Sequence, residues 1–146
     1  MVAASAFILL AGFGTGFALA ARHFELNGSW HLIPARSELH GHEAIQTGTL
    51  NISSREGNIW VERNFRLEDR YESVSTHFTT DAREKASISQ PGFKSKAQWQ
   101  GDVLQVVTNQ NGSTTVERYS LAEDDILELH VERSSGQSEK FYFERQ

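Results

Sequence analysis

The sequence contains no cysteine, and this absence removes several kinds of chemistry. A disulfide framework, a thiolate metal site and a cysteine nucleophile all require this residue. A lipid-modified N-terminal cysteine is excluded for the same reason, so a hydrophobic leader here would not be that of a lipoprotein. The fold must therefore be held by an apolar core. A chain of 146 residues suits one domain, which can bury about two thirds of its unfolded surface.

Positive charge is scarce and dispersed. The chain has 14 Lys and Arg residues against 19 Asp and Glu residues, and its formal net charge is −5. Acidic and basic residues stand side by side, as in Glu62-Arg63 and Glu117-Arg118. Because nucleic-acid binding needs a basic patch or stripe, we expect no nucleic-acid partner.

Motifs that place a nucleophile beside a base are missing. The sequence has no Gly-x-Ser-x-Gly elbow and no glycine-rich phosphate loop between a strand and a helix. The paired carboxylates Asp124-Asp125 fall in a turn, where water keeps them ordinary acids. We therefore predict that the protein is not an enzyme and uses no cofactor.

One cluster resembles metal ligands, namely His40-Gly41-His42-Glu43. Two histidines one residue apart can reach the same ion, but zinc requires three or four ligands. No second cluster is evident, because the other histidines are scattered along the sequence. We interpret this segment as a solvated loop and predict no metal site.

The N-terminal residues 1–21 carry no charge and contain a continuous apolar run. The small residues in Ala18-Leu19-Ala20-Ala21 match the spacing of a signal-peptidase site, so we predict a signal peptide that is cut after Ala20 or Ala21. An uncleaved membrane anchor over residues 2–21 is the alternative, because about 20 apolar residues can span a bilayer. An apolar arm packed in the fold is a third interpretation. No Lys or Arg precedes the run, so the start codon lies upstream or the leader is atypical.

From Gly28 onward, apolar and polar residues alternate with a period of two. The alternation is clearest over residues 127–132, 141–145, 93–99 and 59–65. One dry face and one wet face are typical of an antiparallel sheet. Turn residues such as Gln110-Asn111-Gly112 separate the runs roughly every 10 to 12 residues, which favours a meander of hairpins. Helical periodicity is absent, apart from a single predicted turn around residues 81–85.

These patterns predict an all-β fold. We expect a single antiparallel up-and-down β-barrel of about 8 to 10 strands, preceded by the N-terminal hydrophobic signal segment. A meander of that length must hide its edge strands, and closure into a barrel does so.

The segment Asn27-Gly28-Ser29-Trp30 resembles the Gly-x-Trp signature that opens lipocalins. Residues 28–37 resemble the first strand of small exported bacterial lipocalin-like proteins, except that Ile33 replaces the usual Asn before Pro34. Residues 141–145 resemble their last strand. The resemblance, which covers residues 28–145, implies a lipocalin-like (calycin-type) barrel over residues 22–146. It also implies a bacterial protein that is periplasmic or secreted, with anchoring to the membrane by residues 2–21 as the alternative.

The resemblance further implies a role for Trp30 and Arg145 in closing the barrel. In lipocalins an Arg from the last strand lies over the first-strand Trp, and Arg145 stands at the matching position. A guanidinium over an indole contributes about 0.5–2 kcal/mol. The alternative is a plain core tryptophan and a solvated terminal arginine.

The barrel lumen is the candidate binding site. The apolar side chains expected to face it are Val61, Phe65, Phe78, Trp99, Leu127 and Leu129. Arg63 and Arg133 share the phase of these residues. An inward Arg would pair with the carboxylate of a fatty-acid-like ligand, whereas at a strand end it would emerge into water. The fatty-acid-binding relatives use an Arg and a Tyr two residues apart on a late strand. Here Arg118 and Tyr119 are adjacent and face opposite ways, which argues against that ligand.

The leading functional hypothesis is therefore an exported lipocalin-like protein that holds a small hydrophobic ligand in its lumen. The alternative is a filled barrel that acts as a protein-interaction or structural module without a ligand. Membrane contact is expected only through the N-terminal segment, if it is not cleaved. The sequence carries no signal for an oligomeric state.

Overall fold

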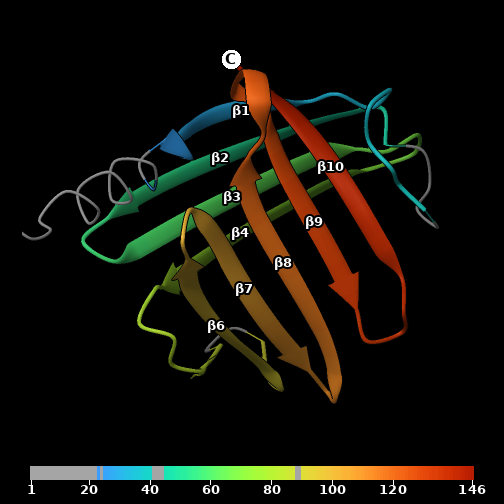
Figure 1. Cartoon of the computed structure of the whole chain (residues 1–146). Helices are drawn as coiled ribbons and strands as arrows, with labels where there is room; N and C mark the ends of the chain where they lie inside the picture. The colour runs from blue at the N-terminus through green and yellow to red at the C-terminus, as the bar shows by residue number, and fades with distance from the viewer. Residues whose placement is uncertain (1–22, 24, 41–44, 88–89) are drawn as a thin grey trace, which may run out of the picture.

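Ten antiparallel strands form one strongly curved sheet in the computed structural model of this chain (Figure 1). The structure describes residues 23, 25–40, 45–87 and 90–146. The strands are β1 (Gly28–Leu32), β2 (Thr47–Arg55), β3 (Asn58–Arg66), β4 (Tyr71–Thr79), β5 (Lys85–Ala86), β6 (Phe93–Gln100), β7 (Val103–Gln110), β8 (Ser113–Leu121), β9 (Leu127–Arg133) and β10 (Ser138–Arg145). A single 3₁₀ turn, η1 (Glu123–Asp125), precedes β9. The predicted all-β fold of 8 to 10 strands is confirmed.

The chain runs as a meander whose first and last strands meet. The order across the sheet is β4-β3-β2-β1-β10-β9-β8-β7-β6-β5, so strands that pair are consecutive in the sequence except at one junction. At that junction β1 pairs with β10, with Trp30 opposite Arg145 and Leu32 opposite Phe143. We call this β1–β10 junction the seam. It joins the two ends of the barrel as the sequence predicted.

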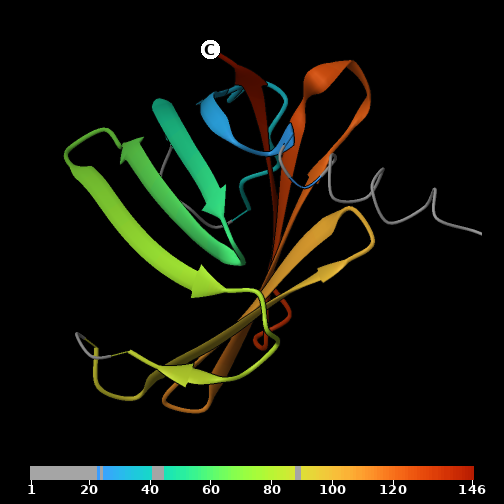
Figure 2. The same cartoon turned by 90° about the vertical axis from the view of Figure 1, so that its left-hand side faces the viewer.

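The other two ends of the sheet, β4 and β5, do not pair with each other. Figure 2 shows β2–β4 (green to yellow-green) and β6–β10 (yellow to red) as two walls that diverge from the seam. Within the described residues, the backbone hydrogen bond from Ala82 N to Ala97 O at 3.1 Å crosses toward β6. We call the space between β4 and β5–β6 the gap. The sheet is therefore a curled half-barrel that is open along one side.

The packed core extends across the sheet and includes the seam. Trp30 is fully buried, and its indole Nε1 donates a hydrogen bond of 3.0 Å to Leu26 O. Arg145 lies over the indole, 4.2 Å from the ring centroid, and its guanidinium donates to the carbonyl oxygens of Asn27 and Glu25 at 3.0 and 2.8 Å. This is the arrangement that the resemblance implied. It ties the start of the first strand to the end of the last.

The lumen side of β2 makes room for an aromatic ring. Gly48 lies opposite Phe65 in the β2–β3 register. A Cβ at Gly48 would stand 2.6 Å from Phe65 Cδ1, which is closer than real Cβ contacts. The missing side chain therefore allows the ring of Phe65 to lie across the strand, where it stacks on Phe141 with 5.7 Å between centroids.

Two further sequence predictions concern residues 81–85 and residues 1–21. The helical turn around residues 81–85 does not form, because Asp81 caps the backbone N–H of Arg83 and Lys85 already begins β5. The signal peptide or anchor at 1–21 lies outside the described residues. Within the described part of the chain, no helix is both long enough and apolar enough to cross a membrane.

Candidate functional site

A cavity of about 710 Å³ lies along the gap, with lining residues from both of its sides. Its wall is built from strands β3 to β8. Phe78, Val74 and Phe93 supply apolar surface, while hydroxyl groups such as those of Thr76 and Thr108 supply polar surface. Pockets for small molecules and cofactors commonly measure about 300–1,000 Å³. The space is therefore large enough for one small ligand.

A buried ion pair forms the inner end of this cavity. Arg63 on β3 and Glu117 on β8 both line it. Arg63 Nη1 donates to Glu117 Oε1 at 2.8 Å, and Nη2 donates to Oε2 at 3.2 Å. The side chains are 18% and 11% exposed, respectively. A two-pronged contact of this kind fixes both orientation and charge.

Tyr119 completes the cluster from the same strand as Glu117. Residues two apart on a strand share a face, and the Tyr119 hydroxyl donates to Glu117 Oε2 at 3.0 Å. Burial, followed by the charge of Glu117, raises the pKa of Tyr119 far above its ordinary value, against the attraction of Arg63. The phenol therefore stays neutral and serves as a hydrogen-bond donor.

The guanidinium of Arg63 keeps its positive charge despite its location. Burial lowers its pKa, whereas the charge of Glu117 and the hydrogen bonds to it raise the pKa, and the net shift is upward from the ordinary value. Arg63 thus lies inside the barrel and not in water. The carboxylate that it meets belongs to the protein.

A second cavity of about 270 Å³ adjoins the first and shares Arg63, Val74, Thr115 and Glu117 with it. Phe65, Phe141 and Arg133 are among its lining residues. Arg133 Nη1 donates to Glu139 Oε2 at 2.8 Å, and the Glu139 side chain is 1% exposed. Both arginines on the lumen phase are therefore matched by buried protein carboxylates.

Glu117 and Glu139 were missed by the sequence analysis. Their signal was available, since Glu117 shares the phase of Tyr119 and Glu139 shares the phase of Phe141 and Phe143. Both acids are buried. An acidic residue in register with buried aromatic residues predicts an internal ion pair whenever an inward arginine is present.

The structure divides the other predicted lumen residues into two groups. Phe78 lines the larger cavity and Phe65 lines the smaller one. Val61, Leu127 and Leu129 belong to the packed core and line neither cavity. Trp99 also lines neither, because its ring stacks on His23 at 3.7 Å between centroids. A role of these residues in ligand binding stays a prediction.

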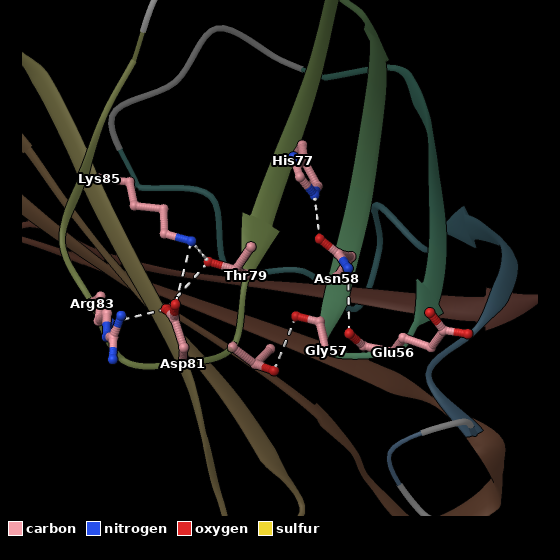
Figure 3. Close-up of polar contacts among 9 residues, drawn as sticks. Glu56, Gly57, Asn58, His77, Thr79, Asp81, Arg83 and Lys85 are labelled. Atoms are coloured by element: carbon pink, nitrogen blue, oxygen red, sulfur yellow. Dashed lines mark hydrogen bonds and ion pairs between the residues drawn. The ribbon is translucent and has the colours of Figure 1, made fainter.

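The segment that joins β4 to β5 carries a set of polar contacts around Asp81 (Figure 3), and they include Lys85, which lines the larger cavity. Lys85 Nζ contacts Asp81 Oδ2 at 3.3 Å and also hydrogen-bonds the hydroxyl of Thr79. The backbone N–H of Arg83 donates to Asp81 at 3.1 Å and, with Lys85 and Thr79, holds the pKa of Asp81 below its ordinary value. On the neighbouring strand pair, His77 hydrogen-bonds the side chain of Asn58 at 3.0 Å.

No group of three or more potential metal ligands occurs among the described residues. In the sequence cluster His40-Gly41-His42-Glu43, only His40 is described. The prediction of a solvated, metal-free loop there stays a prediction.

Comparison with known proteins finds solved structures with a similar fold. No protein-family model matches the chain, and no curated protein sequence matches it. Among solved structures, wild-type fluorescent protein UnaG superposes with a TM-score of 0.67 at 17% identity, over 84% of this chain and 98% of that chain. Secretory abundant heat soluble protein 4 from Ramazzottius varieornatus gives 0.62 at 18%, over 82% and 94%. A Schistosoma mansoni fatty acid binding protein, solved in complex with arachidonic acid, gives 0.61 at 14%, over 84% and 96%.

The chain shares the β-barrel fold of these proteins. At identities this low, the likeness concerns the fold and not the site. It agrees with the family that Gly28-Ser29-Trp30 suggested, at the level of architecture. The bacterial and exported parts of that resemblance stay predictions.

Proposed function

We propose that this protein binds one small, largely apolar molecule in the cavity behind the gap. The observation that carries the proposal is the cavity of about 710 Å³, which lies inside the barrel and opens between strands that do not pair. The fold is shared with a protein solved in complex with arachidonic acid, which supports a container of this kind. The wall combines the apolar side chains of Val74, Phe78 and Phe93 with hydroxyl groups and one ion pair, so a ligand finds both apolar contact and fixed polar groups there.

The location of the packed core restricts where the ligand lies. The seam side of the lumen is filled by fully buried side chains, among them Trp30, Leu50 and Phe143. The ligand therefore occupies the gap side, with its apolar part against Phe78 and Phe93 and its inner end near the Arg63–Glu117 pair.

Titration of the delipidated protein with Nile red, an uncharged solvent-sensitive dye, tests the proposal. We expect saturable binding of one dye per chain with blue-shifted, enhanced emission. Thr108 on β7 and Thr115 on β8 face each other and both line the cavity. Thr108→Phe fills the cavity and should abolish the signal. Thr114→Phe is the matched control, because Thr114 points the other way on β8.

Two results would contradict the proposal. One is a wild-type protein that does not saturate with the dye. The other is a Thr108→Phe variant that binds as well as Thr114→Phe does. The second result would indicate that the dye binds to the outer wall of the barrel. It would favour the alternative of an interaction module. That alternative predicts a lumen filled across its width, and the cavity counts against it.

The proposal includes export. The apolar, uncharged residues 1–21 support a cleaved signal peptide and a periplasmic or secreted protein, with anchoring by residues 2–21 as the alternative. Expression of the full chain in a bacterial host, followed by fractionation and intact-mass analysis, tests it. Loss of the first 20 or 21 residues from soluble, exported protein is the expected result. Full-length mass in the membrane fraction would indicate an anchor, and full-length protein in the cytoplasm would contradict export.

A further inference from the structure

We infer that the buried end of the ligand is uncharged and accepts hydrogen bonds, as an alcohol, ester, amide or ketone does, and that free carboxylates are rejected. This inference rests on the proposed function, because it names the chemical class that the same cavity takes. It departs from the simplest expectation for an arginine inside a barrel of this fold, which is a carboxylate ligand.

The inner wall of the cavity contains one cation and one anion. Arg63 and Glu117 carry opposite charges and contact each other through two hydrogen bonds, while Tyr119 is neutral. The cluster therefore has no net charge. A ligand carboxylate placed here brings a negative charge beside Glu117 with no cation left to balance it. Removing an ion from water costs several kcal/mol in a protein interior unless a partner compensates.

Displacement of Glu117 from Arg63 does not solve the problem. A carboxylate ligand that took its place would leave Glu117 buried without its arginine. Glu117 comes from the middle of β8 and is also held by the Tyr119 hydroxyl, so it cannot swing out to water. The protein's own carboxylate thus occupies the position that an acid ligand would need.

The same cluster has more unused hydrogen-bond donors than unused acceptors. A guanidinium has five N–H donors, and the contacts with Glu117 use two of them. Both oxygens of Glu117 already accept, one from Arg63 alone and the other from Arg63 and Tyr119. The cluster therefore retains three N–H donors, whereas three of the roughly four acceptor sites of the carboxylate are already in use. A ligand oxygen that accepts without carrying charge fits this inventory.

The rest of the cavity wall supplies hydroxyl groups and an ion-paired lysine. The hydroxyls of Thr76, Thr108 and Thr115 line the same cavity, and a hydroxyl can donate or accept as the ligand requires. Lys85 also lines the cavity, at the rim, but it is ion-paired with Asp81 and bonded to Thr79. Each described cation of the wall thus already has an anionic partner from the protein.

The smaller cavity follows the same design. Arg133 is paired with Glu139, which is almost fully buried. Two arginines on the lumen phase, each matched by an acidic residue from another strand, indicate that the interior as a whole is balanced. A neutral ligand leaves this balance intact.

The experiment compares three ligands with one alkyl chain: dodecanol, methyl dodecanoate and dodecanoate at pH 8. Displacement of bound Nile red from the wild-type protein gives each affinity. We expect the alcohol and the ester to bind at least tenfold more tightly than the acid. In Glu117→Gln, Arg63 loses its counter-charge, and the preference should reverse in favour of the acid by tenfold or more.

The matched control is Glu132→Gln. Glu132 pairs with Arg118 at 2.8 Å between neighbouring strands β8 and β9, as Glu117 pairs with an arginine, but neither residue lines either cavity. This variant should keep the wild-type order of affinities. A reversal in both variants would trace the effect to overall charge and would overturn the inference.

If Glu117→Gln folds poorly, refolding in the presence of each ligand gives a second measurement. Dodecanoate added during refolding should restore folded protein and raise its melting temperature, whereas dodecanol should not. Wild-type protein that binds dodecanoate as tightly as dodecanol overturns the inference, and so does a Glu117→Gln variant with an unchanged order. If Nile red and all three ligands fail to bind the wild type, the proposed function itself is wrong and the inference falls with it.

Discussion

The seam side and the gap side of the barrel are built from one continuous sheet but hold different things. At the seam, β1 and β10 are hydrogen-bonded and the space behind them is filled by fully buried Trp30 and Phe143. At the gap, β4 and β5 lack a common ladder, and the space behind them is a cavity with hydroxyl groups and an ion pair in its wall. The seam stabilises the barrel, and the gap leaves room for a ligand.

The difference originates in the strands that border each side. Three of the residues on β10 are the aromatic run Phe141-Tyr142-Phe143, and two of these are buried. β4 instead contains mostly polar side chains: Tyr71 and Val74 are exposed, and Phe78 is its buried apolar residue. β5 has only two residues and cannot form a long ladder. Few buried apolar contacts and an unpaired backbone edge give the gap side the lower local stability.

The largest expected effect comes from the seam. Trp30→Ala should lower the free energy of unfolding by about 3–5 kcal/mol, because a fully buried indole is removed and leaves a cavity. Phe93→Ala, at the wall of the ligand cavity, should lower it by less than about 1 kcal/mol, because that ring is only partly buried. Urea unfolding measures both. Equal losses would remove the contrast between the two sides.

The next effect lies between the two sides, at the internal ion pair. Glu117→Gln should cost about 2–3 kcal/mol of unfolding free energy, because it leaves Arg63 without a counter-charge in a largely buried site. The double variant Arg63→Met/Glu117→Met should cost less than the single one, because no charge is left uncompensated. Guanidinium unfolding of both variants measures this, and a double variant at least as unstable as the single would contradict it.

A smaller effect is expected where Arg145 covers Trp30. Arg145→Ala should cost about 1–2 kcal/mol, through loss of the cation–π contact and of the two bonds to backbone carbonyls. Arg145→Lys should fall between the wild type and the alanine variant, because an ammonium retains charge but not the planar contact. Thermal unfolding ranks the three proteins. A lysine variant as weak as the alanine variant would assign the whole effect to geometry.

The smallest effect on stability is expected at the rim. Asp81→Ala removes the anchor of Lys85 and of the Arg83 backbone N–H, and the urea midpoint should not change measurably. Amide exchange at Ala82 and Arg83 should become faster, because the turn that holds them is lost. The same change should appear in the wild type at acid pH. The pKa of Asp81 is depressed, so its contribution is present above the unfolded-state pKa and is lost as the pH falls through the folded-state value.

Sequence reasoning found the strands because alternation reports directly which face of a strand is dry. It predicted that Leu127 and Leu129 lie on a dry face, and the structure buries both in the core. Alternation does not report how far along the lumen a residue lies, however. For that reason Val61 and Trp99 could not be told apart from Phe78, although only Phe78 of these lines a cavity.

The gap and the ion pair could not be predicted from the sequence for a related reason. Arg63 and Glu117 are 54 residues apart, and only the curvature of the sheet brings β3 to face β8. The pattern of β4 marks it as a strand but does not say that one of its edges has no partner. The turn predicted around residues 81–85 failed because local composition favoured a helix while Asp81 held the backbone in another form.

The most direct test of a container that opens at the gap is an amide NMR titration of the ¹⁵N-labelled protein with dodecanol. The account predicts saturable shifts at one equivalent that cluster on Phe78, Phe93 and Thr108, with little change at Trp30 and Phe143. Shifts centred on the outer face around Trp60, or no saturable shifts at all, would contradict it.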